Sequence, residues 1–173
     1  MRIAVSSDMD EPPARQVVDD LRRRGHSVEV FGALSDGDRA DWAWSAEAAA
    51  RAVANGAADQ AVVCCWTGAG ASIAANKVPG VRAALCADAY AARGARVWSD
   101  ANALALSLRT LSGGLLAEIL DAWFAAGADQ DRDAEDRANI AHLDAIGSAA
   151  PTAGQPAPTG HETAAGAPAG SAK

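Results

Sequence analysis

The stretch CWTGAGAS, which begins at Cys65, places a thiol and a hydroxyl beside a glycine turn. Gly68 and Gly70 allow the backbone to turn tightly, so that amide N–H groups converge on one point. A helix that begins near Ala71 would add its positive end there, which favours a bound oxyanion or phosphate. The same field favours the thiolate form of Cys65. A thiolate base beside an anion hole, with the Thr67 hydroxyl at its rim, suits proton abstraction next to a carbonyl.

Two other interpretations of these thiols remain open. Short glycine motifs are common, so Cys65 also fits a structural strand cysteine followed by a close-packed turn. A redox pair with Cys64 is disfavoured, because a disulfide between adjacent residues is strained and neighbouring strand residues point to opposite faces. With Cys86 the cysteines are three, and they form no CxxC pair and no zinc-type cluster. We therefore expect reduced thiols in a cytoplasmic protein without a metal.

Apolar runs and helical patterns alternate along the chain. Strands are expected at 2–7, 26–32, 60–65, 80–86 and 102–107, and helices at 10–25, 45–56, 71–77, 88–98, 113–126 and 133–146. The run QAVVCC shows no polar alternation, as expected of a strand buried on both faces. The pattern predicts an α/β fold: one Rossmann-like, doubly wound domain with a five-stranded parallel sheet, helices on both faces and a C-terminal helix.

Composition limits the domain organisation and the class of partner. Residues 1–146 form the expected domain, whereas 18 of the 27 residues in 147–173 are Ala, Gly or Pro, which predicts a disordered tail. The net charge of −7 argues against a nucleic-acid-binding protein. The first charge after the opening strand comes at Asp8, which leaves no room for a signal peptide or a membrane span there.

In doubly wound folds, ligands bind beyond the carboxyl ends of the strands. We therefore expect segments 6–11, 65–71 and 98–102 to lie together at that edge of the sheet. The loop 41–44 is expected to form a fourth wall. Each of these segments carries at least one side chain that can hydrogen-bond or stack.

The run from Cys65 to Cys86, CWTGAGASIAANKVPGVRAALC, resembles the signature of the type B ribose-5-phosphate isomerase family, which includes galactose-6-phosphate isomerase subunits. Asp8 and the run SDANALAL extend the resemblance. It implies aldose–ketose isomerisation of a sugar phosphate through a cis-enediolate, without a cofactor or metal. Cys65 would be the proton-shuttling base, Thr67 would assist ring opening, and the backbone of 68–71 would hold the enediolate. The resemblance also implies a homodimer or tetramer with active sites shared between chains.

The resemblance further implies a set of substrate-binding residues. They are Asp8, Met9, Trp42, Trp66, Gly68, Ala69, Gly70, Ala71, Trp98, Ser99, Asn102, Arg132 and Arg137, with Arg109 as another candidate for a phosphate. The arginines fit a surface or interface role equally well.

Five of these positions depart from the family pattern. Met9 and Trp98 stand where the family has histidines, Ser99 replaces an asparagine, Trp42 a tyrosine and Trp66 a glycine. The tryptophans fit aromatic walls that stack on a sugar, or they pack among themselves or at a dimer interface. Because the histidines would handle phosphate and ring opening, a sugar-binding protein with little turnover remains an alternative to an isomerase.

Overall fold

The computed structural model describes residues 1–126 and 132–148. Its centre is one sheet of five parallel strands in the order β2-β1-β3-β5-β4. The strands are β1 (Arg2–Ser7), β2 (Ser27–Gly32), β3 (Gln60–Cys65), β4 (Ala83–Leu85) and β5 (Ala103–Ser107). This order, with every pair parallel, confirms the predicted doubly wound α/β fold.

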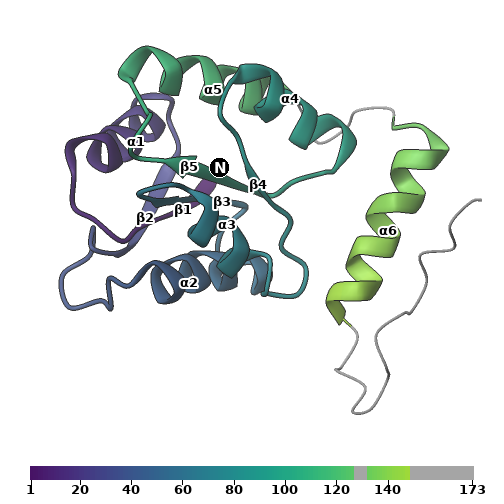
Figure 1. Ribbon diagram of the computed structural model, residues 1–173, viewed down its shortest axis with the longest axis horizontal. Coiled ribbons are helices and arrows are strands. Elements are labelled where there is room, and N and C mark those ends of the chain that lie inside the picture. Colours follow the sequence, from purple (N-terminus) through teal and green to yellow (C-terminus); the bar gives the residue numbers. More distant parts are fainter. Residues whose placement is uncertain (127–131, 149–173) are drawn as a thin grey trace, which may run out of the picture.

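Helices cover both faces of the sheet. They are α1 (Pro12–Arg23), α2 (Trp42–Ala54), α3 (Ala69–Ala75), α4 (Ala89–Trp98), α5 (Gly113–Ala125) and α6 (Ala134–Ser148). Figure 1 shows α1, α4 and α5 on one face and α2 and α3 on the other, whereas α6 stands apart from both layers. The predicted tail begins inside α6, and residues 149–173 lie outside the described part of the chain.

The sheet separates two hydrophobic cores, and β3 contributes to both because every one of its residues is buried. Cys64 faces the core under α1, α4 and α5, which also contains Trp123. Cys65 faces the alanine-rich core under α2 and α3. The expected opposite directions of the two thiols are confirmed, and both cysteines are free.

Two predicted element boundaries are wrong, for local reasons. Helix α2 begins at Trp42, three residues before the expected Ser45, because the Asp41 carbonyl accepts the first helical hydrogen bond from the Ser45 N–H. Strand β4 has only three residues. The N–H groups of Arg82 and Ala83 donate to the side chains of Asn102 and Asn76, which replaces part of the expected ladder.

The strand order reverses between β1 and β3, and in doubly wound folds the crevice outside the carboxyl ends of the strands at such a point is where ligands bind. Ser7 pairs with Cys64, so Asp8 leaves the sheet beside Cys65. The fold therefore brings the first and third predicted strand ends together. Among the described helices, none has the length and apolar character needed to cross a bilayer.

Candidate active site

Cys65 ends β3 and fixes the turn that follows it. Its side chain is buried, and its carbonyl oxygen accepts hydrogen bonds from the N–H of Gly68 at 3.2 Å and of Leu108 at 3.0 Å. The turn is thereby tied to the end of β5. This places Cys65 at the carboxyl end of β3, directly before the glycine turn, with its side chain in the core under α2 and α3.

Gly68 makes the tight turn possible. Its φ of +74° lies in the left-handed region, and a Cβ there would lie 2.5 Å from Cδ1 of Leu85 and 2.9 Å from the carbonyl carbon of Leu106. Because the Gly68 N–H is used within the turn, it is not available to a ligand. The amides of 69–71 open α3, where the first N–H groups of a helix have no acceptor in the helix itself.

The indole ring of Trp42 packs on one side of this turn. A Cβ at Gly70 would lie 2.9 Å from Cε3 of Trp42, so the six-membered ring of Trp42 packs directly against the Gly70 backbone. Trp42 is 47% exposed and Trp66 is 50% exposed. The Trp66 carbonyl accepts from the Ser107 hydroxyl and from the Arg109 N–H, both at 3.1 Å, which places Arg109 at the same edge of the sheet.

Asp8 carries an unusual carboxylate at this edge. Its Oδ1 atom is buried without a hydrogen-bond partner among the described residues. Burial raises the pKa of Asp8 above its usual value, against the opposing effect of a backbone hydrogen bond. Burial, and to a lesser extent electrostatic interactions with Cys65 and Asp8, raise the pKa of the neighbouring Cys64 to about 12. A ligand hydroxyl is the kind of donor that this carboxylate lacks.

Two further predicted residues flank the crevice. The Met9 N–H donates to the Ser7 hydroxyl at 3.2 Å, and the Met9 side chain packs against the core beneath α1 and α5. Met9 therefore offers a ligand an apolar surface where the related proteins were expected to have a histidine. Thr67 is exposed, so its hydroxyl is open to a ligand at the rim of the turn.

The expectation that segment 98–102 lies at the same edge is wrong. Ala61 pairs with Ala103, and the Ala61 N–H donates to the carbonyl of Asn102, so this segment lies at the amino ends of the strands. The distance from there to Cys65 along β3 is about 16 Å. The physical reason is connectivity, because α4 returns the chain to the amino edge before β5 begins.

At the amino edge, Asn102 has a bracing role. Its Oδ1 accepts from the Arg82 N–H at 2.8 Å, and its Nδ2 donates to the Gly80 carbonyl at 2.9 Å. Trp98 packs on the backbone of Gly94 and meets the ring of Tyr90 edge-on at 5.9 Å.

The surface tryptophans therefore do not share one pocket wall. Trp42 lies at the carboxyl edge and Trp98 at the amino edge, while the ring of Trp44 packs against the Arg39 guanidinium 3.5 Å away. Trp123 belongs to the core under α1, α4 and α5, and its indole N–H donates to Gln60 at 2.7 Å.

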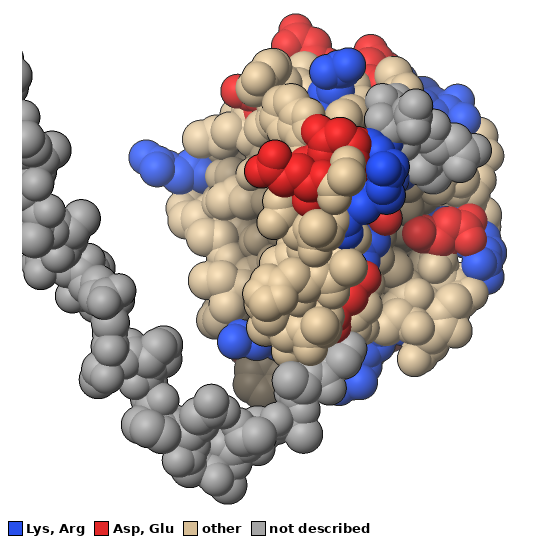
Figure 2. All heavy atoms as spheres, turned by 90° about the vertical axis from the view of Figure 1, so that its right-hand side faces the viewer, with Lys and Arg blue, Asp and Glu red and all other residues tan. Residues whose placement is uncertain are grey.

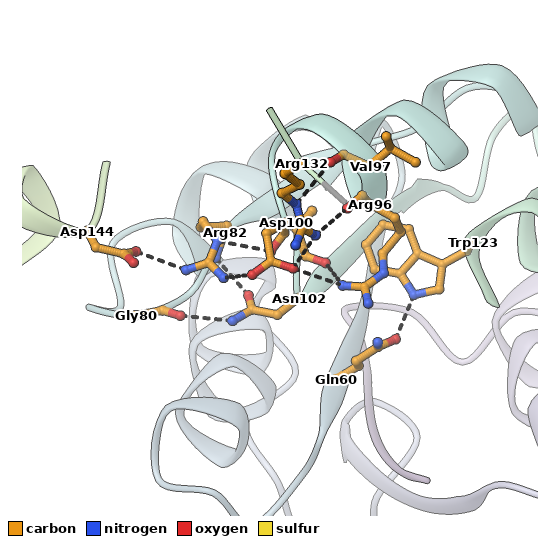
Figure 3. Close-up of polar contacts among 11 residues, drawn as sticks. Gln60, Gly80, Arg82, Arg96, Val97, Asp100, Asn102, Trp123, Arg132 and Asp144 are labelled. Carbon is orange, nitrogen blue, oxygen red and sulfur yellow. Dashed lines mark hydrogen bonds and ion pairs between the residues drawn. The ribbon is translucent and has the colours of Figure 1, made fainter. Parts of the chain in front are cut away.

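Arg132 is engaged with its own chain. Its guanidinium donates to the carbonyl of Val97 at 3.0 Å, to that of Arg96 at 2.9 Å and to the carboxylate of Asp100 at 2.7 Å (Figure 3). Arg137 is exposed and donates to the Arg132 carbonyl. Sequence reasoning included Asp100 in the run SDANALAL but gave it no role, because a single acidic residue in a loop has no pattern that reveals its partners.

Within residues 1–126 and 132–148, no three His, Cys, Asp or Glu side chains gather in a way that could hold a metal ion.

On the face that bears α6, acidic and basic side chains are interspersed (Figure 2).

Comparison with known proteins agrees with this arrangement. The family model described as ribose/galactose isomerase matches residues 3–140. Ribose-5-phosphate isomerase B of Escherichia coli is 40% identical over 111 residues, which cover 64% of this chain and 74% of that protein. The galactose-6-phosphate isomerase subunit LacB of Clostridium acetobutylicum is 36% identical over 127 residues, which cover 73% of each chain.

The fold is shared as well. The solved structure of Clostridium thermocellum ribose-5-phosphate isomerase B superposes with a TM-score of 0.75 at 35% identity, covering 84% of this chain and 97% of that one. With the family model, the sequence relatives and the fold in agreement, the chain belongs to the ribose/galactose isomerase family of enzymes.

Proposed function

We propose that this chain interconverts an aldose phosphate and the corresponding ketose phosphate through a cis-enediolate, with Cys65 as the base. The observation that carries the proposal is the position of Cys65 at the end of β3, directly before the turn whose amides open α3. A base and an array of N–H donors then face one crevice. The named relatives, a ribose-5-phosphate isomerase and a galactose-6-phosphate isomerase subunit, support this class of substrate.

Proton transfer follows from this geometry. In the open-chain aldose, the Cys65 thiolate takes the proton from C2, and the electron pair moves through the C1–C2 bond to the carbonyl oxygen O1. The amides of 69–71 donate to the resulting negative charge, which lowers the barrier most where the charge develops. The thiol returns its proton to C1, and a proton passes from O2 to O1, which leaves the ketose. The anion hole does not include the Gly68 N–H, because Cys65 already accepts from it.

The side chains at the rim have supporting roles in the proposal. The exposed Thr67 hydroxyl assists ring opening, and Asp8 accepts a hydrogen bond from a sugar hydroxyl through its unpartnered Oδ1 atom. Trp42 and Trp66 present half-exposed indoles to the C–H faces of the sugar. Arg109, whose N–H donates to the Trp66 carbonyl at the carboxyl edge of the sheet, would bind the phosphate.

The remaining predicted residues would reach this crevice from a second copy of the chain. Trp98, Ser99, Asn102 and Arg132 gather about 16 Å from Cys65 at the opposite edge of the sheet, too far to share one small sugar. A homodimer that places the amino edge of one copy over the carboxyl edge of the other would join the two halves. The exposed apolar side chains Trp42, Trp66, Ile73, Leu85, Tyr90 and Trp98 support such an interface.

Sugar binding without turnover is the second candidate. Met9 packs against the core and Trp98 against Gly94 and Tyr90, so neither provides the acid–base group expected at these positions from the family resemblance. A binding protein would not need the Cys65 thiol. The two candidates therefore differ in whether Cys65 exchanges a substrate proton.

The test is solvent-deuterium incorporation at the carbon beside the carbonyl, across a panel of aldose and ketose phosphates and free sugars. We expect Cys65→Ala to slow exchange by about 10³-fold, a typical effect of removing a general base. Cys64→Ala is the matched control, since Cys64 faces the other core and should leave exchange intact. Binding without exchange by the wild type would favour the binding protein.

A further inference from the structure

Asp100 lies at the centre of the charged cluster in Figure 3. Its Oδ2 atom accepts from the Arg82 guanidinium at 2.8 Å, and its Oδ1 atom accepts from Arg132 at 2.7 Å. The guanidinium of Arg96 lies 4.0 Å from Oδ1. The Asp100 carbonyl accepts another bond from Arg82, at 2.9 Å. The Asp100 carboxylate thus contacts three arginines, and the Asp100 carbonyl forms a second contact with one of them, Arg82.

Each arginine also holds a different part of the chain. Arg82, directly before β4, forms an ion pair of 2.9 Å with Asp144 of α6. Arg96 of α4 donates to the Ala101 carbonyl, inside the loop that contains Asp100. Arg132 donates to the last carbonyls of α4. Through these contacts the Asp100 carboxylate joins the loop 98–102 to α4, to the start of β4 and to α6.

The cluster depends on the negative charge of Asp100. Among the described residues, the ion pairs of the cluster join the guanidinium groups of Arg82, Arg96 and Arg132 to the carboxylate of Asp100, and that of Arg82 also to Asp144; the three arginine side chains are at most 17% exposed. Arg96 is the most buried of them, and its Nε atom has no partner in the described part of the chain. Without the Asp100 charge, three partly buried cations would repel one another, and the loop would lose the group that draws them together.

The backbone of Asp100 matches this role. Its φ of +47° makes it the only residue other than glycine with a positive φ among those described. Asp and Asn tolerate this left-handed conformation better than other side chains. Asp100→Asn therefore keeps the size of the side chain and suits the backbone geometry of the loop, while it removes the charge and replaces one of the two acceptor oxygens by an NH2 donor.

We propose that Asp100 is the positioning residue for the half-site that one copy of the chain lends to its partner. It touches no substrate, and it acts by fixing the loop 98–102 and the Arg132 guanidinium relative to one another. The proposal rests on the proposed isomerase function and on its shared active site. It adds a residue that neither the sequence motif nor the family resemblance singled out.

The first test compares Asp100→Asn with Asp59→Asn. Asp59 is a matched control, because it also lies at the amino edge and is held by Arg2 through a side-chain contact of 2.6 Å and a main-chain contact of 2.7 Å. We expect Asp100→Asn to lower kcat/KM by about 100-fold, the effect of a misplacement of about 1 Å in a catalytic array. Asp59→Asn should keep wild-type activity. An Asp100→Asn protein with wild-type activity would overturn the proposal.

A mixed dimer separates positioning from a general structural role. Full-length Asp100→Asn and Cys65→Ala chains are co-expressed with different affinity tags, and the heterodimer is purified through both. One of its sites combines Cys65 of the first chain with the intact loop of the second. We expect its deuterium exchange to return to about half that of the wild-type dimer, although each parent is nearly inactive. Failure of this recovery would show that Asp100 acts within its own chain, and would overturn the proposal.

Two safeguards keep the outcomes distinct. If Asp100→Asn does not yield folded protein, Arg82→Lys takes its place. This substitution removes the paired contacts of the guanidinium to Asp100 and keeps the positive charge. A mixed dimer of Arg82→Lys and Cys65→Ala chains should then recover about half of the wild-type deuterium exchange. Wild-type protein that exchanges no sugar would refute the proposed function, and the Asp100 proposal with it. An active wild type whose mixed dimers do not recover would refute the Asp100 proposal alone.

Discussion

At the scale of single residues, Asp8 is a group whose surroundings disfavour its charged form. Its buried, unpartnered oxygen and its raised pKa both show that the folded chain holds this carboxylate in an environment that disfavours its charge. This cost to folding agrees with the role proposed for Asp8, which is to accept a hydrogen bond from a sugar hydroxyl. Sites of this kind commonly trade stability for activity.

Asp8→Asn should therefore stabilise the protein at neutral pH. Because the folded-state pKa of Asp8 lies above the unfolded value, the folded chain binds the proton more tightly, and this contribution is lost as pH rises through the folded pKa. The variant should gain about 2 °C in Tm at pH 7, equivalent to roughly 0.5–1 kcal/mol, and the gain should shrink in acid. Thermal unfolding followed by circular dichroism at both pH values measures it. A lower Tm at pH 7 would contradict the assigned cause.

At the scale of elements, the turn between β3 and α3 is set by packing as much as by backbone freedom. Gly68 and Gly56 both have positive φ, +74° and +72°. A side chain at Gly68 would collide with Leu85 and with the backbone of Leu106, whereas nothing lies within 4 Å of a Cβ at Gly56. The two positions therefore separate backbone strain from collision.

We expect Gly56→Ala to lower the free energy of unfolding by about 1 kcal/mol, the cost of the left-handed conformation alone. Gly68→Ala should lower it by about 3 kcal/mol or more, because the collision with β5 backbone adds to the strain. Urea unfolding of the two variants gives both values. Equal losses would mean that the neighbours of Gly68 move aside at little cost, and that the turn is less rigid than its contacts indicate.

At the scale of the whole molecule, α6 is the helix that packs least against its own chain. Figure 1 shows it apart from the two helical layers, and none of residues 134–146 is buried. Leu143 is 49% exposed and Ile146 is 58% exposed. Because most helices in proteins are stabilised by packing an apolar face, we expect α6 to contact a second copy of the chain in the proposed dimer.

Sedimentation equilibrium should accordingly give twice the chain mass of 17.5 kDa, or a larger even multiple. Leu143→Asp combined with Ile146→Asp should shift the population toward the monomer, since charges would replace apolar contacts. The exposed Glu135 of the same helix provides the control, and Glu135→Gln should leave the mass unchanged. A wild-type monomer at micromolar concentration would contradict the shared site.

The sequence by itself determined the features that depend on local patterns. Strand and helix patterns predicted the five strands and the doubly wound order. The prediction of a strand at QAVVCC also predicted that Cys64 and Cys65 face different cores, because neighbouring strand residues point to opposite faces. The spacing of Gly68 after Cys65 likewise predicted a tight turn, because positive φ at a glycine is a property of a few neighbouring residues.

Only the tertiary structure decided what depends on distant segments. It moved the loop 98–102 to the far edge of the sheet, engaged Arg132 with α4, and placed Asp100 among three arginines that lie 4 to 32 residues away in sequence. No periodicity encodes these contacts, since each is formed by charged side chains of separate elements after the sheet has assembled. The candidate site residues could therefore be named from the sequence, whereas the edge of the sheet at which each of them lies was a consequence of the fold.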